Sequence, residues 1–313
     1  MSSAIILGAT GQDGTFLFSF LESKEYSVFG VGSKKVLSTE EKWSDIKSID
    51  ICDFQQVSGL IKRIQPDEIY HLAAVHQSSQ DKVGDPRELL KESFEVNVLS
   101  LQNCLEAVRQ FSSKTRIFYA ASSHIFGHPG MEPQDENTPL NPIDIYGITK
   151  ASGVSLCRMY RSLYGTFVSV GILYNHESWL RGNQFVSQKI VRGALDCREN
   201  SNHKLILGDL SGEVDWGFAP DYVDAMWKIL ALPEPDDFII SSGEKHKVQE
   251  FVSIAFDAVG LDWRNYVEER KGITTKNFFS LVGNSGKLVK KTGWKSSVSF
   301  AQMINLLINH SRG

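Results

Sequence analysis

Residues 4–14 read Ala-Ile-Ile-Leu-Gly-Ala-Thr-Gly-Gln-Asp-Gly, an apolar run that leads directly into three spaced glycines. The apolar run predicts a short buried strand, and the residues that follow have the pattern of a helix. Between a strand and a helix, glycine permits a sharp turn and a close approach of the backbone to a pyrophosphate, which the free N–H groups of the helix then attract. We therefore expect a dinucleotide-binding loop, with cofactor contacts from Gly8, Gly11, Gln12, Asp13 and Gly14.

Further along the chain, strand and helix patterns alternate. Strands are expected at 27–31, 68–74, 116–121 and 168–173, and helices at 16–21, 94–108 and 146–163. This alternation predicts an α/β fold with a Rossmann-like, doubly wound parallel sheet. The last 140 or so residues have longer loops, with helices expected at 221–232, 248–259 and 300–309. We predict a nucleotide-binding domain over 1–173, joined again by about 215–242, and a smaller α/β domain over 174–313 that mainly binds substrate.

Composition narrows the class of protein. The 313 residues correspond to about two domains, and 42% hydrophobic with 22% charged residues is typical of a soluble globular chain. A net charge of −4 favours neither nucleic acid nor an anionic membrane as partner. There is no run of about 18 apolar residues and no basic leader, so we expect a cytoplasmic protein. Four widely spaced cysteines and scattered histidines predict buried free thiols and no metal site.

The end of the second expected strand bears on the choice of cofactor. It reads Val31-Gly32-Ser33-Lys34-Lys35, whereas NAD-binding folds usually place an acidic residue there for the ribose 2′-hydroxyl. The ammonium groups of Lys34 and Lys35 could instead meet a 2′-phosphate, which predicts NADP, with NAD as the alternative. Asp50 and Ile51 are expected beside the adenine. Further cofactor contacts are expected from Leu72, Ala73 and Ala74.

Tyr146 and Lys150 are the candidate catalytic pair. They are four positions apart on one face of an expected helix, and an ammonium group near a phenol favours the phenolate. A tyrosinate can take a hydroxyl proton while hydride leaves the carbon for a nicotinamide. Ser122 and Ser123, at the end of the preceding strand, can donate hydrogen bonds to the substrate oxygen. Together with the glycine loop, these residues predict a nicotinamide-dependent oxidoreduction.

At this point the sequence resembles a known family, the extended short-chain dehydrogenases/reductases, and within it the GDP-mannose 4,6-dehydratases. The likeness covers nearly the whole chain. It is carried by Gly11-Gln12-Asp13-Gly14, Pro66-Asp67-Glu68-Ile69-Tyr70, Asn175-His176-Glu177-Ser178, Arg181-Gly182, Asp215-Trp216-Gly217, Asp221-Tyr222-Val223, Ala225-Met226-Trp227, Ser242-Gly243-Glu244 and Gly293-Trp294-Lys295.

The resemblance implies a reaction and a set of roles. In that family the cofactor oxidises C4 of a nucleotide-bound hexose, a carboxylate base removes the C5 proton, water leaves C6, and hydride returns to C6. Tyr146 would then be the C4 oxidation base, and Lys150 its electrostatic partner and ribose ligand. A GDP-sugar is the implied substrate, and helices 94–108 and 146–163 imply a homodimer or homotetramer. The implied substrate contacts are Asn175, Glu177, Arg181, Asn183, Lys189 and Trp216.

The sequence departs from the family where the C5 base should stand. The family pattern is Ser-Thr-Ser-Glu, whereas this chain has Ala121-Ser122-Ser123-His124. The neutral imidazole of His124 can accept a proton, with an unperturbed pKa of ~6.5. Near the nucleotide, Val214 replaces a basic residue and Arg181 stands alone where the family has a pair of arginines.

A third departure near the nucleotide is residues 274–277, which replace an Arg-Pro-Thr-Glu stretch.

Three hypotheses remain open. The first is a 4,6-dehydratase. The second is 4-oxidation, 4-reduction or epimerisation without dehydration, which needs only Tyr146, Lys150 and the cofactor. The third is a cofactor-binding protein without turnover.

Overall fold

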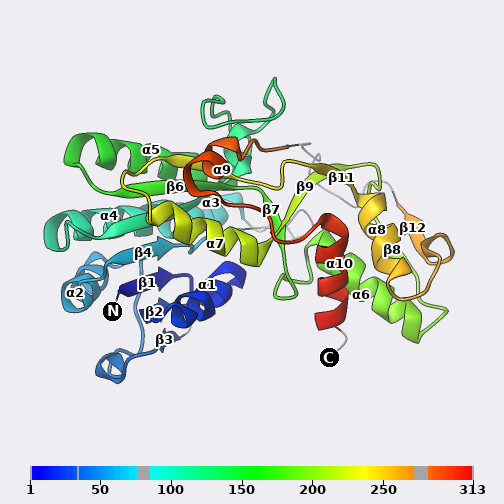
Figure 1. Cartoon of the computed structure of the whole chain (residues 1–313), viewed down its shortest axis with the longest axis horizontal. Helices are drawn as coiled ribbons and strands as arrows, with labels where there is room; N and C mark the ends of the chain where they lie inside the picture. Colours follow the sequence, from blue (N-terminus) through cyan, green and yellow to red (C-terminus); the bar gives the residue numbers. More distant parts are fainter. Residues whose placement is uncertain (1, 34, 77–84, 271–280, 312–313) are drawn as a thin grey trace.

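The computed structural model describes residues 2–33, 35–76, 85–270 and 281–311. Its largest layer is a seven-stranded sheet in the order β10-β6-β5-β4-β1-β2-β3, in which only β3 runs antiparallel to its neighbour (Figure 1). The strands are β1 (Ser3–Leu7), β2 (Ser27–Val31), β3 (Val36–Ser38), β4 (Glu68–His71), β5 (Arg116–Ser122), β6 (Val168–Leu173) and β10 (Asp237–Ile240).

Helices cover both faces of this sheet, and each face has its own apolar core. On one face the core includes Leu60 of α2, Leu105 of α4 and Val154 of α5. On the other it includes Leu17 of α1 and Met226 of α7, with α9 alongside. The helices are α1 (Gln12–Ser23), α2 (Phe54–Ile64), α3 (Pro86–Phe94), α4 (Ser100–Phe111), α5 (Ile145–Tyr164), α7 (Ala219–Leu230) and α9 (Gly286–Thr292). This arrangement confirms the predicted doubly wound parallel fold.

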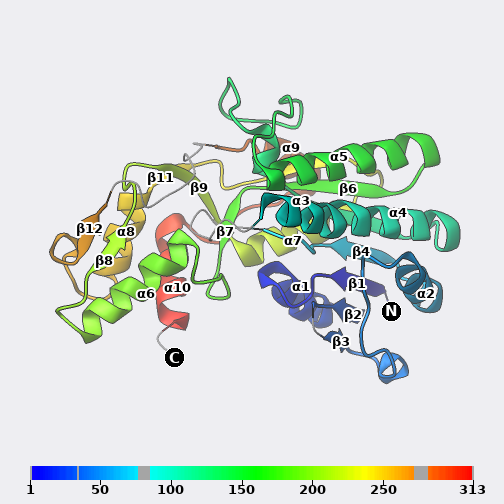
Figure 2. The same ribbon diagram turned by 180° about the vertical axis from the view of Figure 1, so that it is seen from behind.

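A smaller part of the molecule lies beyond the carboxyl ends of these strands, on the right of Figure 1 and the left of Figure 2. It has a three-stranded sheet, β11-β9-β7, and a β12–β8 pair, packed with three helices around a third apolar core. The elements are β7 (Asn175–Glu177), β8 (Leu205–Leu207), β9 (Glu213–Phe218), β11 (Lys245–Lys247), β12 (Val267–Glu269), α6 (Val186–Glu199), α8 (Val248–Asp257) and α10 (Phe300–His310). After β9 the chain returns to the large sheet through α7 and β10.

Several element bounds differ from the expected ones. The strand expected to reach Ala74 ends at His71, because the β4 ladder stops there although the chain stays apolar. The helix expected to start at residue 94 starts at Pro86, where the Asp85 side chain caps it by accepting from Arg87 N. The helical stretch that begins at Pro86 continues through a π-helical segment, Glu95–Leu99, into α4. No helix of the described ranges is long and apolar enough to cross a membrane.

All four cysteines are free thiols. Cys104, Cys157 and Cys197 are buried as expected, whereas Cys52 is exposed. The prediction of buried thiols is therefore wrong for Cys52, which lies in the turn before α2, where the backbone is at the surface.

Candidate active site

The glycine loop joins β1 to α1, and its three glycines differ in what they face. Gly8 has φ +97°, and a Cβ there would lie 2.7 Å from Ala73 N, so the chain after β4 runs against the loop. A Cβ on Gly14 would lie 2.6 Å from Ala9 Cα. A Cβ on Gly11 would meet only Gly8 O, at 3.4 Å, and no side chain caps α1. The first-turn N–H groups therefore have no side-chain cap, which fits a bound phosphate.

The basic turn after β2 lies next to this loop. Gly32 N donates to Lys35 O at 2.8 Å, which closes the turn, and a Cβ on Gly32 would lie 2.6 Å from Thr10 Oγ1. Lys35 is exposed there, and Lys34 lies outside the described residues. The Lys35 cation can thus approach a ribose whose phosphates bind the loop.

Asp50 and Ile51 lie in the turn that leads to α2. The Asp50 carboxylate accepts from Cys52 N at 2.9 Å, and Ile51 packs against the sheet core. Their predicted place beside the adenine stays a prediction. Leu72, Ala73 and Ala74 follow β4, and Leu72 N donates to Leu7 O at 2.8 Å. This contact brings the segment to the glycine loop, as the cofactor assignment requires.

Tyr146 and Lys150 lie in the first turns of α5, on the face that packs against β5. Burial raises the pKa of Tyr146 to about 12, opposed by the charge of Arg181 and by a hydrogen bond with Ser122. Lys150 is 1% exposed and its Nζ donates to Ala120 O at 2.7 Å. Burial lowers the pKa of Lys150 to about 7. The expected lowering of the Tyr146 pKa by Lys150 is therefore not what the structure shows, because loss of water dominates for both groups.

His124 packs against the same turn of α5. Ser122 ends β5, and Ser123–Phe126 form a 3₁₀ turn, so the three residues of the Ser-Ser-His stretch are together. His124 Nδ1 lies 2.9 Å from Asp144 Oδ2, while Asp144 Oδ1 accepts from Gly147 N at 2.6 Å and caps α5. The ring centroids of His124 and Tyr146 are 5.5 Å apart.

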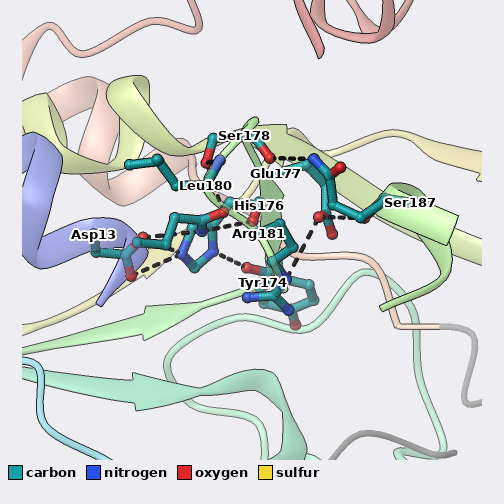
Figure 3. Close-up of polar contacts among 10 residues, drawn as sticks. Asp13, Tyr174, His176, Glu177, Ser178, Leu180, Arg181 and Ser187 are labelled. Atoms are coloured by element: carbon teal, nitrogen blue, oxygen red, sulfur yellow. Dashed lines mark hydrogen bonds and ion pairs between the residues drawn. The ribbon is translucent and has the colours of Figure 1, made fainter. Parts of the chain in front are cut away.

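A second network links the glycine loop to the smaller part (Figure 3). Both oxygens of Asp13 accept from His176 Nε2, at 2.9 and 3.0 Å, and His176 Nδ1 donates to Tyr174 O at 2.7 Å. Burial alone would raise the pKa of Asp13, but the charge of His176 and the hydrogen bonds from His176 and Gln12 together outweigh it, and the pKa is lowered. Burial alone would lower the pKa of His176, but Asp13 outweighs it and the pKa is raised. Both ring nitrogens bond acceptors, as an imidazolium requires.

Arg181 is held next to this network by a buried carboxylate. Its Nε lies 3.5 Å from Glu177 Oε2, which also accepts from Ser187 Oγ at 2.5 Å (Figure 3). The guanidinium lies over the Phe185 ring, 3.7 Å from the centroid. Because the Arg181 charge lowers the pKa of Tyr146, this cation belongs to the catalytic region. Glu177 is 3% exposed, so its ion pair with Arg181 is buried.

The other predicted substrate residues lie in different environments. Asn175 and Asn183 are exposed, and Lys189 on α6 is half-buried. Trp216 is 3% exposed in the third core, 5.3 Å from Phe251 between ring centroids. The indole therefore packs in the core, and its assignment to substrate stays a prediction. Among the residues that the structure describes, no three His, Cys, Asp or Glu side chains are grouped to hold a metal ion.

Sequence reasoning missed Asn97, in the π-helical segment. Its Oδ1 accepts from Val75 N at 2.7 Å, and its Nδ2 donates to Val75 O at 3.2 Å and to Thr149 Oγ1 at 2.9 Å. It ties the segment after β4 to α5 between Tyr146 and Lys150. A π-helical turn often marks a functional site, but the apolar pattern around it gives no signal of one.

Comparison with known proteins agrees with this geometry. The family model described as GDP-mannose 4,6 dehydratase matches residues 5–307. The Arabidopsis thaliana protein named GDP-mannose 4,6 dehydratase 2 is 34% identical over 325 residues, covering 98% of this chain and 86% of its own. The GDP-mannose 4,6-dehydratase of Yersinia enterocolitica is 34% identical over 277 residues, covering 84% of this chain and 73% of its own.

Solved structures share the fold at lower identity. The dTDP-glucose 4,6-dehydratase of Bacillus anthracis, in complex with NAD, has a TM-score of 0.83 at 18% identity, over 100% of this chain and 97% of that one. RMD from Pseudomonas aeruginosa, complexed with NADPH, has a TM-score of 0.82 at 18% identity, over 100% of both chains. With a family model that spans nearly all of its length, the chain belongs to the GDP-mannose 4,6-dehydratase family.

Proposed function

We propose that this protein is a nicotinamide-dependent 4,6-dehydratase of a GDP-sugar. The observation that carries the proposal is the meeting of Tyr146, Ser122 and His124 at the end of β5, beside the glycine loop. The family membership supports the substrate class. The larger sheet with its helices would bind the cofactor, and the smaller part the nucleotide sugar.

The cofactor site fits a dinucleotide. The uncapped N-terminus of α1 would hold the pyrophosphate, and the Gly8–Ala73 contact would set the loop against the end of β4. The exposed Lys35 and its neighbour Lys34 favour NADP over NAD. When bound, the nicotinamide supplies a hydride acceptor for the sugar C4.

The chain's own groups then handle the protons and charges. Tyr146 takes the proton of the C4 hydroxyl, and Ser122 and Ser123 donate hydrogen bonds to that oxygen. Lys150, buried behind Tyr146, supplies the nearby ammonium when protonated and reaches the ribose. Arg181, fixed by Glu177 and Phe185, would meet the negative charge of the nucleotide diphosphate, which suits a planar guanidinium.

The proposal extends to assembly and location. Leu99, in the π-helical segment, and Met159, Leu163 and Tyr164 on α5 are exposed, at 49%, 39%, 67% and 51%. Apolar side chains of this size on neighbouring helices favour a homodimer or homotetramer through this face. A cytoplasmic location is consistent with these assignments.

A second candidate function follows from His124. Because an imidazole stands where the family has a glutamate, the enzyme could oxidise or epimerise C4 without losing water. That chemistry needs only Tyr146, Lys150 and the cofactor. A cofactor-binding protein without turnover is the third candidate, and the intact Tyr146 and Lys150 argue against it.

Mass spectrometry of products separates these candidates. The protein is incubated with NADP⁺ and, in turn, GDP-mannose and other nucleotide sugars. We expect a GDP-sugar product that has lost the mass of one water. A change of two hydrogens, or an epimer of unchanged mass that chromatography separates from the substrate, would establish the second candidate. No turnover of any nucleotide sugar would overturn the proposal of an enzyme.

A further inference from the structure

His124 and Asp144 are joined in a way that fixes the proton on the imidazole. His124 Nδ1 lies 2.9 Å from Asp144 Oδ2, with the two side chains 29% and 21% exposed. The other Asp144 oxygen accepts from Gly147 N at 2.6 Å, so the carboxylate is anchored to the first turn of α5. An ionised carboxylate only accepts hydrogen bonds, and therefore the hydrogen of a neutral His124 resides on Nδ1.

This leaves Nε2 of His124 as a proton acceptor. Among the described residues, no hydrogen-bond partner reaches Nε2, and the side chain is partly open to solvent. A histidine whose Nδ1–H is bound to a carboxylate is the usual arrangement of a general base, because the carboxylate orients the ring and stabilises the imidazolium that forms.

The dyad lies next to the group assigned to C4. The centroid of the His124 ring is 5.5 Å from that of Tyr146, and the planes are at 81°. Among the described residues, the other titratable groups facing it are Asp144, the N-cap of α5, and His76 after β4, whose ring centroid is 6.2 Å from that of His124. Arg181 acts from the loop after β7, through its charge on Tyr146. In a hexose whose C4 hydroxyl lies at Tyr146, C5 is bonded directly to C4. The C5 proton would then lie near the His124 imidazole.

We propose that Asp144 is a positioning residue that holds His124 in the Nδ1–H form, so that Nε2 removes the C5 proton of the 4-keto sugar. The C5–H bonding pair becomes the C5–C6 double bond, and the C6–O bond breaks with its pair on oxygen. The imidazolium returns its proton to that oxygen, so that one water leaves and His124 is neutral again. This proposal rests on the proposed dehydratase function.

Two substitutions of Asp144 distinguish its role as the N-cap of α5 from its effect on the tautomer of His124. Asn and Ser are both good N-caps, so Asp144→Asn and Asp144→Ser keep the bond to Gly147 N. The Asn amide would donate to Nδ1 and move the imidazole hydrogen to Nε2, which disables the base. Ser leaves the ring without an orienting carboxylate. Asp53→Asn, at the N-cap of α2, is the matched control.

The readout splits the reaction into its two half-steps. C4 oxidation is followed in single turnovers as the transient reduction of the cofactor, because the hydride later returns to C6, and proton removal is followed by C5 deuterium uptake from heavy water. We expect Asp144→Asn to lower C5 exchange by ~10²–10⁴-fold, the typical contribution of a general base, while C4 oxidation falls far less. Asp53→Asn should match the wild type in both.

Nitrogen-15 NMR of histidine-labelled protein tests the tautomer without turnover, with His124→Gln to assign the signal. We expect the Nδ1–H form in the wild type and the Nε2–H form in Asp144→Asn. If the carboxylate only caps α5, Asp144→Asn would leave the tautomer and both half-steps unchanged, and this would overturn the proposal. Undiminished C5 exchange in Asp144→Asn would overturn it too. Absence of C4 oxidation in the wild type would instead overturn the proposed function itself.

Discussion

At the scale of single residues, the chemistry depends on the Tyr146 hydroxyl. We expect Tyr146→Phe to lower C4 oxidation by ~10²–10⁴-fold, because the variant keeps the ring but loses the proton acceptor. Cofactor binding should persist, since the ring's packing against His76, 4.4 Å between centroids, is retained. Because burial raises the pKa of Tyr146 to about 12 and lowers that of Lys150 to about 7, wild-type kcat/KM for C4 oxidation should rise with pH up to about 7 and rise less steeply above it, where the Lys150 ammonium is lost. Activity near that of the wild type would refute the assignment.

The basic turn after β2 decides between two cofactors. We expect tighter binding of NADP(H) than of NAD(H), and the reverse order in the double variant Lys34→Glu/Lys35→Glu, since carboxylates repel a 2′-phosphate and accept from a 2′-hydroxyl. A tenfold loss of NADP affinity would correspond to about 1.4 kcal/mol in calorimetry. Lys290→Glu/Lys291→Glu, an exposed pair on α9, makes the same charge change elsewhere and should leave the order unchanged. NAD preference in the unmodified protein would contradict the assignment.

At the scale of elements, the π-helical segment before α4 supports the first turns of α5 through the side chain of Asn97. Replacing it by Ala removes the side-chain partner of Val75 N and Val75 O, while Thr149 Oγ1 keeps its bond to Tyr146 O, and an unsatisfied buried group costs about 1–3 kcal/mol. We expect Asn97→Ala to lower the free energy of unfolding by that amount. It should also lower kcat by roughly tenfold or more, because the first turns of α5 lose their support.

Asn103→Ala on α4 is the control for this variant. Its Nδ2 donates to Ile51 O and Cys52 O, at 3.2 and 3.0 Å. These are also bonds from a side-chain amide to the backbone, but they do not involve α5. Urea unfolding should show a similar loss of stability, while kcat at saturating cofactor stays unchanged. A loss of kcat as large as in Asn97→Ala would assign both effects to stability alone.

The bounds of a strand could be predicted from the sequence where the strand is fully buried. The strands 27–31 and 168–173 have the expected bounds, because runs of apolar residues buried on both faces have no competing interpretation. The helices α2 and α6 were missed. α2 begins at a cap, Asp53, that accepts from Gln55 N and Gln56 N, and its short apolar stripe is broken by polar residues. Three-residue strands such as β11 are too short for a period of two to be seen.

At the scale of the whole molecule, the local part of the site was predictable and the long-range part was not. The glycine loop and the Tyr146–Lys150 pair are short motifs whose geometry follows from one turn or one helix. His124 and Asp144 are 20 residues apart, and Asp13 and His176 are 163 apart, so their contacts exist only after the sheet forms. The burial of Trp216 was not predictable either, because the motif that contains it does not reveal which face of β9 is buried.

The Asp13–His176 pair is the long-range contact with the clearest consequence for stability, because it joins the glycine loop to β7. With side chains 18% and 10% exposed, removal of one partner should cost about 3–5 kcal/mol, as for other buried ion pairs. We expect a double-mutant cycle with Asp13→Asn and His176→Gln to show strong coupling in the free energy of unfolding. The surface pair of His246 and Glu250, Nδ1 to Oε2 3.0 Å, should couple by no more than about 1 kcal/mol.

This coupling should have a defined pH window. The lowered pKa of Asp13 contributes stability above its ordinary value of 3.8, and that contribution is lost as pH falls through the lowered value. The raised pKa of His176 contributes stability that is complete below 6.5 and is lost as pH rises through the raised value. The coupling should therefore be largest between about pH 4 and pH 6.5 and decline at alkaline pH. A coupling as small as that of His246–Glu250, or one unchanged from pH 6 to pH 9, would mean that the pair is not charged in the folded protein.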